Sequence, residues 1–219
     1  MKVILAAATE LELHPFRSLS NGLSDLLLDY WITGVGPIAT TQFLEKNITA
    51  KKPDLIIQIG IAGAINDQID IGSSVAVKEE MISDMGVWEA DGYKDIFDMG
   101  FADRNTFPYQ HGMLVNPHQL LLTQSKLPLV KGFGVNEIST SSEKISLLKH
   151  HYNVDIESME GNAFHYVCLM NKIPFIQLRG ISNYVGDRDK SRWKIKESLQ
   201  TTYDACMTLL DQVKEDNTK

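Results

Sequence analysis

The chain has 219 residues, of which 43% are hydrophobic and 22% are charged. This balance is typical of a soluble globular protein and excludes collagen-like, disordered and disulfide-scaffold chains. The formal net charge of -7 provides no positive field for a phosphate backbone, so we expect no nucleic-acid partner. Because no linker-like composition interrupts the chain, its length favours a single domain over residues 1–219.

The two cysteines, Cys168 and Cys206, lie in apolar, helix-like segments, which predicts buried reduced thiols and a reducing compartment. The apolar start of the chain, residues 1–8, is too short for a secretion signal and is followed directly by Glu10 and Glu12. No apolar run approaches the ~20 residues that span a bilayer. We therefore expect a cytoplasmic protein with no membrane partner.

The first half of the chain alternates strand and helix patterns. Short apolar runs predict strands at residues 2–8, 30–35, 54–60 and 73–78. Helices are expected at 10–19 and 37–50, and Pro37 suits the first position of the second one. The segment 85–108 is polar and rich in glycine, aspartate and aromatic residues, without a period, which predicts a long loop or an excursion.

The second half continues the alternation. Helices are expected at 116–124, 142–151 and 161–171, and strands at 132–136, 154–158 and 173–178. The helix at 161–171 is expected to bury Ala163, Val167 and Met170. The final helix is expected to bury residues spaced by four, three, four and three: Leu199, Tyr203, Cys206, Leu210 and Val213. The tail from about residue 215 is polar and is expected to fray.

Polar side chains follow the ends of four predicted strands. Buried strands that alternate with helices predict an α/β fold with a largely parallel sheet, which binds ligands at the carboxyl ends of its strands. The residues at these ends include carboxylates, an arginine, an amide and a glycine-bracketed turn: Thr9, Glu10 and Glu12; 60–63; Met159 and Glu160; Arg179, Ser182 and Asn183. We expect them to converge on one edge of the sheet.

Two cofactor sites are weighed against plainer interpretations. The segment 34–39 (GVGPIA) fits the dinucleotide pattern G-x-G-x-x-[GA], but Asp54 begins the next strand, whereas the pattern needs an acidic residue at its end. It is interpreted as a tight turn before a helix, with a dinucleotide oxidoreductase kept as an alternative. Asp155, Glu157 and Glu160 have no histidine neighbour and no calcium-loop spacing, so no metal is expected.

The glutamates that follow the strands also have two interpretations. Glu10, Glu12 and Glu160 could each merely stabilise the first turn of a helix. A catalytic role requires Glu12 and Glu160 to reach one pocket from two different strands, which sequence spacing does not decide. Ser182 lacks a G-x-S-x-G elbow, which argues against a serine hydrolase.

Several segments together resemble a known family. They are KVILAAATELEL at the start, ITGVGPIATT, QIGIAGAI, SMEG at 158–161 and RGISN at 179–183. With these segments the chain resembles the nucleoside phosphorylase and nucleosidase superfamily, most closely the methylthioadenosine/adenosylhomocysteine nucleosidases. The loop 183–189 (NYVGDRD) with Trp193 is similar to that of the branch that hydrolyses futalosine. The resemblance implies a three-layer α/β/α sandwich around a mixed, largely parallel sheet, of the nucleoside phosphorylase type.

The resemblance also implies roles for individual residues. Glu12 matches the acid that orients or activates the attacking water, and Arg179 matches an arginine near that water. Met159 and Glu160 match the pair that touches the ribose. The turn that lines the sugar is matched by three small residues: Gly60, Ala62 and Gly63. No cofactor is implied, and the family implies a homodimer or a higher homo-oligomer.

Asn183 departs from the adenine-specific nucleosidases, which have an aspartate at this position. Its amide NH₂ can donate to a 6-oxo group while its carbonyl accepts from N7–H of the purine. A leaving purine needs such help at N7, and general acid catalysis of this kind contributes about 10²–10⁴-fold. Asn183 therefore predicts hypoxanthine, the base of futalosine, rather than adenine.

The early turn favours water over phosphate as the nucleophile. Thr9 and Glu12 occupy it, and it lacks the G-x-P-x-R-type phosphate turn of the superfamily's phosphorylases. A carboxylate facing the nucleophile would repel phosphate. We expect hydrolysis of an N-ribosidic bond. The alternatives are another purine nucleosidase, acting on methylthioadenosine/adenosylhomocysteine or aminodeoxyfutalosine, and a non-catalytic nucleoside-binding protein.

The 5' extension of futalosine ends in a benzoate, whose carboxylate needs a cation. Arg188 and Arg104 are the candidates, and the aromatic ring could be flanked by Trp88, Trp193, Phe101 or Phe107. The plainer interpretation of Arg188 is a surface pair with its neighbours Asp187 and Asp189. Both interpretations stay open.

Overall fold

A mixed sheet of eight strands forms the centre of the molecule in a computed structural model that describes residues 1–21, 26–82, 84–90 and 92–217. Its strands are β1 (Lys2–Ala7), β2 (Leu27–Ile32), β3 (Leu55–Ala64), β4 (Ser74–Ile82), β7 (Met113–Val115), β8 (Leu129–Gly134), β9 (Ile156–Ser158) and β10 (Phe175–Tyr184). Their order is β10-β4-β8-β9-β3-β1-β2, with β7 paired to β4. Because β10 also pairs with β3, five strands form a closed ring of pairings from which β1 and β2 extend.

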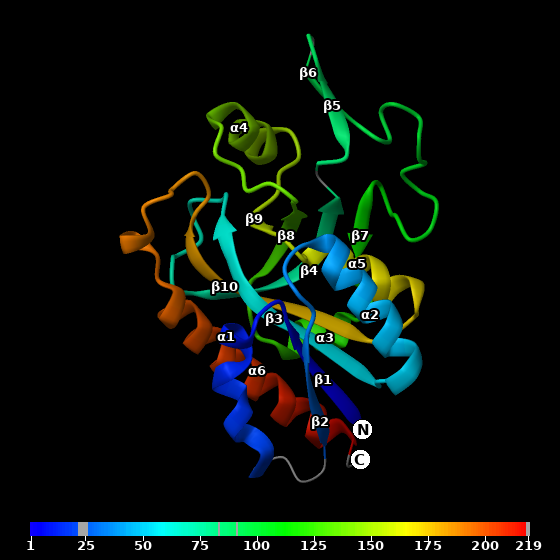
Figure 1. Ribbon diagram of the computed structural model, residues 1–219, viewed down its shortest axis with the longest axis vertical. Helices are drawn as coiled ribbons and strands as arrows, with labels where there is room; N and C mark the ends of the chain where they lie inside the picture. Colours follow the sequence, from blue (N-terminus) through cyan, green and yellow to red (C-terminus); the bar gives the residue numbers. More distant parts are fainter. Residues whose placement is uncertain (22–25, 83, 91, 218–219) are drawn as a thin grey trace.

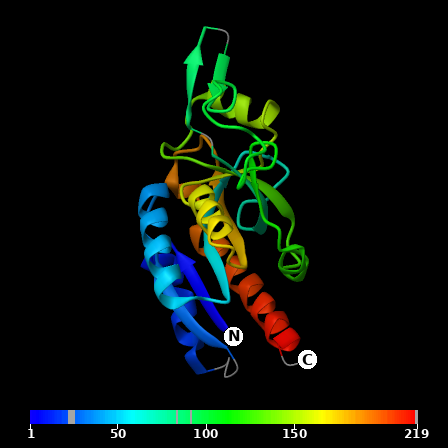
Figure 2. The same ribbon diagram turned by 90° about the vertical axis from the view of Figure 1, so that its right-hand side faces the viewer.

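Helices cover both faces of the sheet, as Figures 1 and 2 show. The helical elements are α1 (Glu10–Leu13), the 3₁₀ helix η1 (His14–Asn21), α2 (Pro37–Lys51), α3 (Gln119–Gln124), α4 (Ser142–His150), α5 (Gly161–Met170), the 3₁₀ helix η2 (Lys190–Arg192) and α6 (Ile195–Asn217). Alternate residues of β1 point to opposite faces: Val3 and Leu5 pack with α6, whereas Ile4 and Ala6 pack with α2 and α5. The three-layer α/β/α sandwich is therefore confirmed.

Most pairings are parallel, as the buried apolar strands predict. β1 pairs with β2 and β3, β3 with β10, β4 with β8, and β8 with β9, all in parallel. Three pairings are antiparallel: β10 with β4, β3 with β9, and β4 with β7. The carboxyl ends of β1, β3 and β10 therefore lie at one edge of the sheet, and the three-residue β9 lies antiparallel beside the carboxyl end of β3, at Gly63 and Ala64. The site is built from residues of these segments.

Segment 85–108 was predicted to be a long loop or an excursion, and it is not a loop throughout. It contains a hairpin of β5 (Gly86–Glu89) and β6 (Gly92–Asp95), which projects at the end of the molecule opposite both termini (Figures 1 and 2). Trp88 and Tyr93 face each other across it, with ring centroids 5.3 Å apart. All of β5 is exposed. A strand without a buried face needs no alternation of apolar and polar residues, so this strand left no sign in the sequence. The short strand β7 was likewise not predicted.

Smaller corrections concern element ends and one buried residue. β3 and β10 each run for 10 residues, past the predicted ends at 60 and 178. The predicted helix at 10–19 is one α-helical turn followed by a 3₁₀ helix. Met170 is 45% exposed, contrary to prediction, because it ends α5, whereas Ala163 and Val167 are buried. The final helix buries Leu199, Cys206, Leu210 and Val213, with Tyr203 partly buried.

Other expectations concern the chain's thiols, tail and membrane contacts. Cys168 and Cys206 are both buried and free of disulfides. The predicted polar tail continues α6 as far as Asn217, and its last two residues lie outside the described part of the chain. Within the described residues, we find no helix with the length and apolarity that a bilayer crossing requires.

Candidate active site

A pocket of about 310 Å³ opens at the carboxyl ends of these strands. Eight of the residues predicted for the site line it: Glu12, Ala62, Gly63, Met159, Glu160, Asn183, Arg188 and Trp193. Two others, Gly60 and Arg179, lie directly behind it, against Glu12 and Glu160. The structure thus brings together residues that are up to 181 positions apart in the sequence, from Glu12 to Trp193.

Glu12 is fixed by hydrogen bonds from two elements. Its Oε2 accepts from the Thr9 backbone N–H at 3.0 Å, as in the capping box that starts α1, and also from Thr9 Oγ1 at 2.8 Å. Its Oε1 accepts from the Ile61 backbone N–H of β3 at 3.3 Å. Glu12 therefore both caps a helix and lines the pocket. Glu10, by contrast, points to the surface and pairs with Arg17.

Arg179 lies behind the two glutamates and pairs with Glu160. It is only 1% exposed, its Nη2 donates to Gln58 Oε1 at 3.1 Å, and its Nη1 lies 3.7 Å from Glu160 Oε2. Gly60 makes room for it, because a Cβ there would lie within 3 Å of both Arg179 Nη1 and Glu12 Oε1. Burying two carboxylates without a nearby positive charge would be costly. The buried guanidinium of Arg179 supplies that positive charge.

Glu160 follows β9 at the start of α5 and reaches across to the turn before α2. Its Oε1 accepts from the Gly36 backbone N–H at 3.0 Å. Gly36 adopts φ +87°, a conformation that side-chain-bearing residues rarely take, so the glycine suits this turn. The pKa of Glu160 is raised above its ordinary value, because the effect of burial exceeds the opposing effect of the nearby Arg179. The 34–39 segment thus forms a turn that holds a pocket carboxylate.

Asn183 lies on β10 with its amide held in one orientation. Its Oδ1 accepts from Ser182 Oγ at 2.8 Å, and its Nδ2 donates to the Tyr184 carbonyl at 2.8 Å. Flipping the amide would direct its oxygen at the Tyr184 carbonyl. The remaining N–H of Nδ2 and the second lone pair of Oδ1 are left for a ligand.

The mouth of the pocket carries an aromatic ring and a cation. The Arg188 guanidinium lies over the Trp193 indole, with Cζ 5.4 Å from the ring centroid. The alternative pairing of Arg188 with its acidic neighbours is wrong, because Asp187 and Asp189 both pair with Arg192. No carboxylate of the described residues is within ion-pair distance of Arg188.

The other candidates for the distal end lie elsewhere in this chain. Arg104 is held by Asp95 and Asp98. Trp88 lines a neighbouring pocket together with Tyr93 and Tyr152. Phe101 and Phe107 are exposed and are not among the residues that line the main pocket.

Glu157 is a pocket residue that sequence reasoning assigned only to a rejected metal cluster. It is 5% exposed, lines the pocket, and accepts from the Ser139 backbone N–H at 3.0 and 3.3 Å. Burial raises its pKa. A carboxylate inside a short predicted strand was the available signal. Within the described chain, no three His, Cys, Asp or Glu side chains are grouped to hold a metal.

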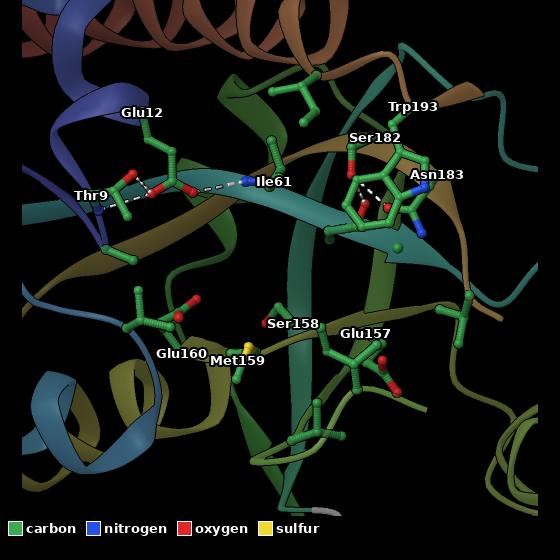
Figure 3. Close-up of a pocket in the computed structure, with 18 of the residues that line it drawn as sticks. Thr9, Glu12, Ile61, Glu157, Ser158, Met159, Glu160, Ser182, Asn183 and Trp193 are labelled. Atoms are coloured by element: carbon green, nitrogen blue, oxygen red, sulfur yellow. Dashed lines mark hydrogen bonds between the residues drawn. The ribbon is translucent and has the colours of Figure 1, made fainter. Parts of the chain in front are cut away.

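The pocket has two chemically different ends, shown in Figure 3. Glu12 and Glu160 occupy one end, and Glu157 and Asn183 occupy the other, with Ser158 and Met159 between them. Paired carboxylates beside an arginine can hold hydroxyl groups, orient water and stabilise a developing cation. An amide and a carboxylate can bind the polar edge of a heterocycle.

The match to a family covers most of the chain. A model described as the phosphorylase superfamily matches residues 31–215, and the chain belongs to this superfamily.

Individual relatives are nucleosidases. Futalosine hydrolase of Thermus thermophilus is 28% identical over 204 residues, which cover 91% of this chain and 89% of that protein. A mutant futalosine hydrolase of Helicobacter pylori has the same fold, with a TM-score of 0.82, 16% identity, and coverage of 97% and 99% of the two chains. A mutant methylthioadenosine nucleosidase of H. pylori, with 5'-methylthioadenosine in its active site, gives a TM-score of 0.81, 15% identity, and coverage of 96% and 98%.

Proposed function

We propose that the chain hydrolyses the N-ribosidic bond of futalosine and releases hypoxanthine and dehypoxanthine futalosine, a step of menaquinone biosynthesis. The observation that carries the proposal is the pairing of an oriented asparagine at one end of the pocket with two buried glutamates at the other. The names of the relatives from T. thermophilus and H. pylori support the same assignment.

The glutamate end suits the chemistry at the sugar. Cleavage of an N-ribosidic bond leaves an oxocarbenium-like sugar, which a nearby carboxylate stabilises. We assign Glu160, with Met159, to the ribose, where its carboxylate accepts from the hydroxyls. Glu12 orients or activates the water, assisted by Arg179. The small residues Gly60, Ala62 and Gly63 let the sugar approach the backbone.

The asparagine end suits the departure of a 6-oxopurine. In the orientation fixed by Ser182 and Tyr184, Asn183 presents one free N–H and one free lone pair. The N–H donates to the 6-oxo group and the carbonyl accepts from the protonated N7. Adenine, with an amino group at position 6, would place a donor against the amide N–H.

The charge around the nucleophile position supports water. Glu12 and Glu160 are both buried carboxylates there, with Arg179 as the guanidinium between them. An incoming phosphate would meet this negative charge, whereas water can accept and donate at the same place. The assignment requires no metal or cofactor.

The mouth of the pocket supports a substrate with an anionic, aromatic 5' extension. Arg188 has a charge that no acid of the described chain neutralises, and Trp193 offers a flat face beside it. We assign the benzoate of futalosine to this pair. Leu11 and Val35 are exposed beside the mouth, which fits burial against a second copy in a homodimer or higher homo-oligomer.

Incubation with futalosine in phosphate-free buffer, with hypoxanthine followed by chromatography, tests the proposal. Inosine and methylthioadenosine serve as comparison substrates, and Glu160→Gln serves as the inactive control. We expect hypoxanthine from futalosine without added phosphate. Release that requires phosphate would make the protein a phosphorylase, and release of adenine from methylthioadenosine instead would refute the assignment of Asn183. Nucleoside binding without turnover would indicate a non-catalytic member.

A further inference from the structure

Glu157 is a buried carboxylate that the proposed reaction does not yet use. It lies in the three-residue strand β9, two residues before Met159, and its side chain lines the pocket at the same end as Asn183 (Figure 3). Removing a carboxylate from water is costly, so a buried one with few partners calls for an explanation.

The strand register places Glu157 and Asn183 on either side of Gly63. Asn183 on β10 pairs with Gly63 on β3, and Gly63 pairs with Glu157 on β9. Two strand spacings separate the outer residues by about 10 Å between backbones. Gly63 has no side chain between them, and a Cβ there would lie 2.9 Å from Val185 Cγ2 and 3.5 Å from Asn183 Nδ2. Val185 and Asn183 thus lean over Gly63, and the space between Glu157 and Asn183 is part of the main pocket, which all four residues line.

Glu157 keeps most of its hydrogen-bonding capacity. Among the described residues it accepts hydrogen bonds from Ser139, whereas an ionised carboxylate has about four acceptor sites. The neighbouring Lys144 donates its Nζ to the Glu137 carbonyl. An ionised carboxylate can only accept, so the free sites of Glu157 call for a donor on the ligand.

We propose that Glu157 accepts the N1–H of a 6-oxopurine whose N7 and O6 edge is bound by Asn183, and that it is thereby a specificity-determining residue of this site. The inference rests on the proposed function, because it takes hypoxanthine as the base. Adenine has a lone pair at N1, which the Glu157 carboxylate would repel. The two residues thus select the same base from opposite edges, and a mismatch that leaves a buried polar group unpaired can cost up to ~10⁴–10⁵-fold.

Binding of free bases to the wild-type protein provides the first test. Hypoxanthine, 1-methylhypoxanthine and adenine are compared by isothermal calorimetry, which needs no turnover. We expect 1-methylhypoxanthine, which lacks the N1–H, to bind at least ~10-fold more weakly than hypoxanthine. Equal binding of the two would overturn the role of Glu157 alone. Failure of all three to bind would refute the proposed function, and this inference with it.

Two variants separate the hydrogen bond from mere space. In Glu157→Gln the amide NH₂ can face N1, so we expect hypoxanthine to bind ~10-fold more weakly and the preference over adenine to fall. In Glu157→Ala the ratio between hypoxanthine and 1-methylhypoxanthine should approach one. A preference for hypoxanthine that stays unchanged in both folded variants would contradict the proposal.

Glu137→Gln is the matched control. Glu137 is exposed, belongs to the same segment as Ser139, and lines the neighbouring pocket rather than this one. The Glu137→Gln variant removes the same charge close to the site without changing the space between Glu157 and Asn183. Its preference among the bases should therefore stay as in the wild type. A change equal to that of Glu157→Gln would attribute the effect to net charge and overturn the proposal. Melting temperatures establish that each variant is folded.

Discussion

The two ends of the pocket differ in how completely the protein has used its own hydrogen bonds. At the glutamate end, Glu12 accepts from three donors, and Arg179 lies between Gln58 and Glu160. At the asparagine end, Ser139 is the one residue in the described part of the chain that donates to Glu157. Fixed charges of this kind suit the reaction that we propose for the first end. The second end keeps donors and acceptors free for recognition of a base.

The largest expected effect concerns the glutamate end. Glu12→Gln keeps the size of the side chain but removes the charge that we propose orients or activates water, so kcat should fall by about 10²–10⁴-fold with little change in KM. Steady-state release of hypoxanthine from futalosine measures both constants. Glu10→Gln is the matched control, because Glu10 is two residues away and pairs with Arg17 on the surface. An equal loss in both variants would remove Glu12 from the proposed chemistry.

Asn183→Asp tests the asparagine end. In the wild type, Asn183 Nδ2 lies 2.8 Å from the Tyr184 carbonyl oxygen. In the variant an oxygen takes the place of Nδ2, and because two acceptors repel each other, the new carboxyl group must either hold a proton or move. We expect the ratio of kcat/KM for futalosine to that for methylthioadenosine to fall by about 10³-fold. The two substrates are measured with the same preparation. An unchanged ratio would show that Asn183 does not choose the base.

Glu80→Gln tests the polar groups buried behind the glutamate end. Glu80 is fully buried, accepts from Gln177 Nε2 at 2.9 Å, and burial raises its pKa from 4.5 to about 7. Between these two pH values the folded protein holds a proton that the unfolded chain has released, so wild-type stability falls as the pH rises from 4.5 to about 7.

The glutamine variant lacks this proton and should lose that pH dependence. Its free energy of unfolding relative to wild type should therefore rise by roughly 3 kcal/mol across that interval and then stay constant. Urea unfolding at a series of pH values measures the difference. A difference that does not change with pH would mean that Glu80 titrates alike in the folded and unfolded chains.

Arg188→Ala concerns the mouth, where the smallest effect is expected. Loss of the cation over Trp193 should raise KM for futalosine by about 10-fold and leave inosine, which lacks the benzoate, unaffected. Arg17→Ala, at a surface arginine paired with Glu10, serves as the control. A similar loss for both substrates would indicate that Arg188 supports the loop rather than the benzoate.

The sequence predicted the elements of the central layers because their apolar residues follow clear periods. Residues of β1 and β3 are almost all buried, and their short apolar runs stood out. The β5–β6 hairpin was missed, because an exposed ribbon carries no such period. β10 runs through Arg179 and Asn183, polar residues that made the strand seem to end early.

The candidate site was predicted in part, for a physical reason. Residues that follow strand ends, such as Glu12 and Glu160, are identifiable from position alone, and both line the pocket. Glu157 pairs with Gly63, which is 94 positions away in the sequence and pairs in turn with Asn183. Only this strand register brings Glu157 near Asn183. The ion pairs of the loop around Arg188 also depend on its three-dimensional geometry, because Asp187 and Asp189 pair with Arg192 rather than with Arg188.

Cleavage of futalosine in phosphate-containing buffer made with water labelled with heavy oxygen tests the central claim most directly. The wild-type protein is mixed with the nucleoside, and the sugar product is analysed by mass spectrometry before its anomeric hydroxyl exchanges. The account predicts free hypoxanthine and a dehypoxanthine product that carries the label, because water attacks beside Glu12 and Glu160. A sugar phosphate without the label, or an intact nucleoside, would contradict it.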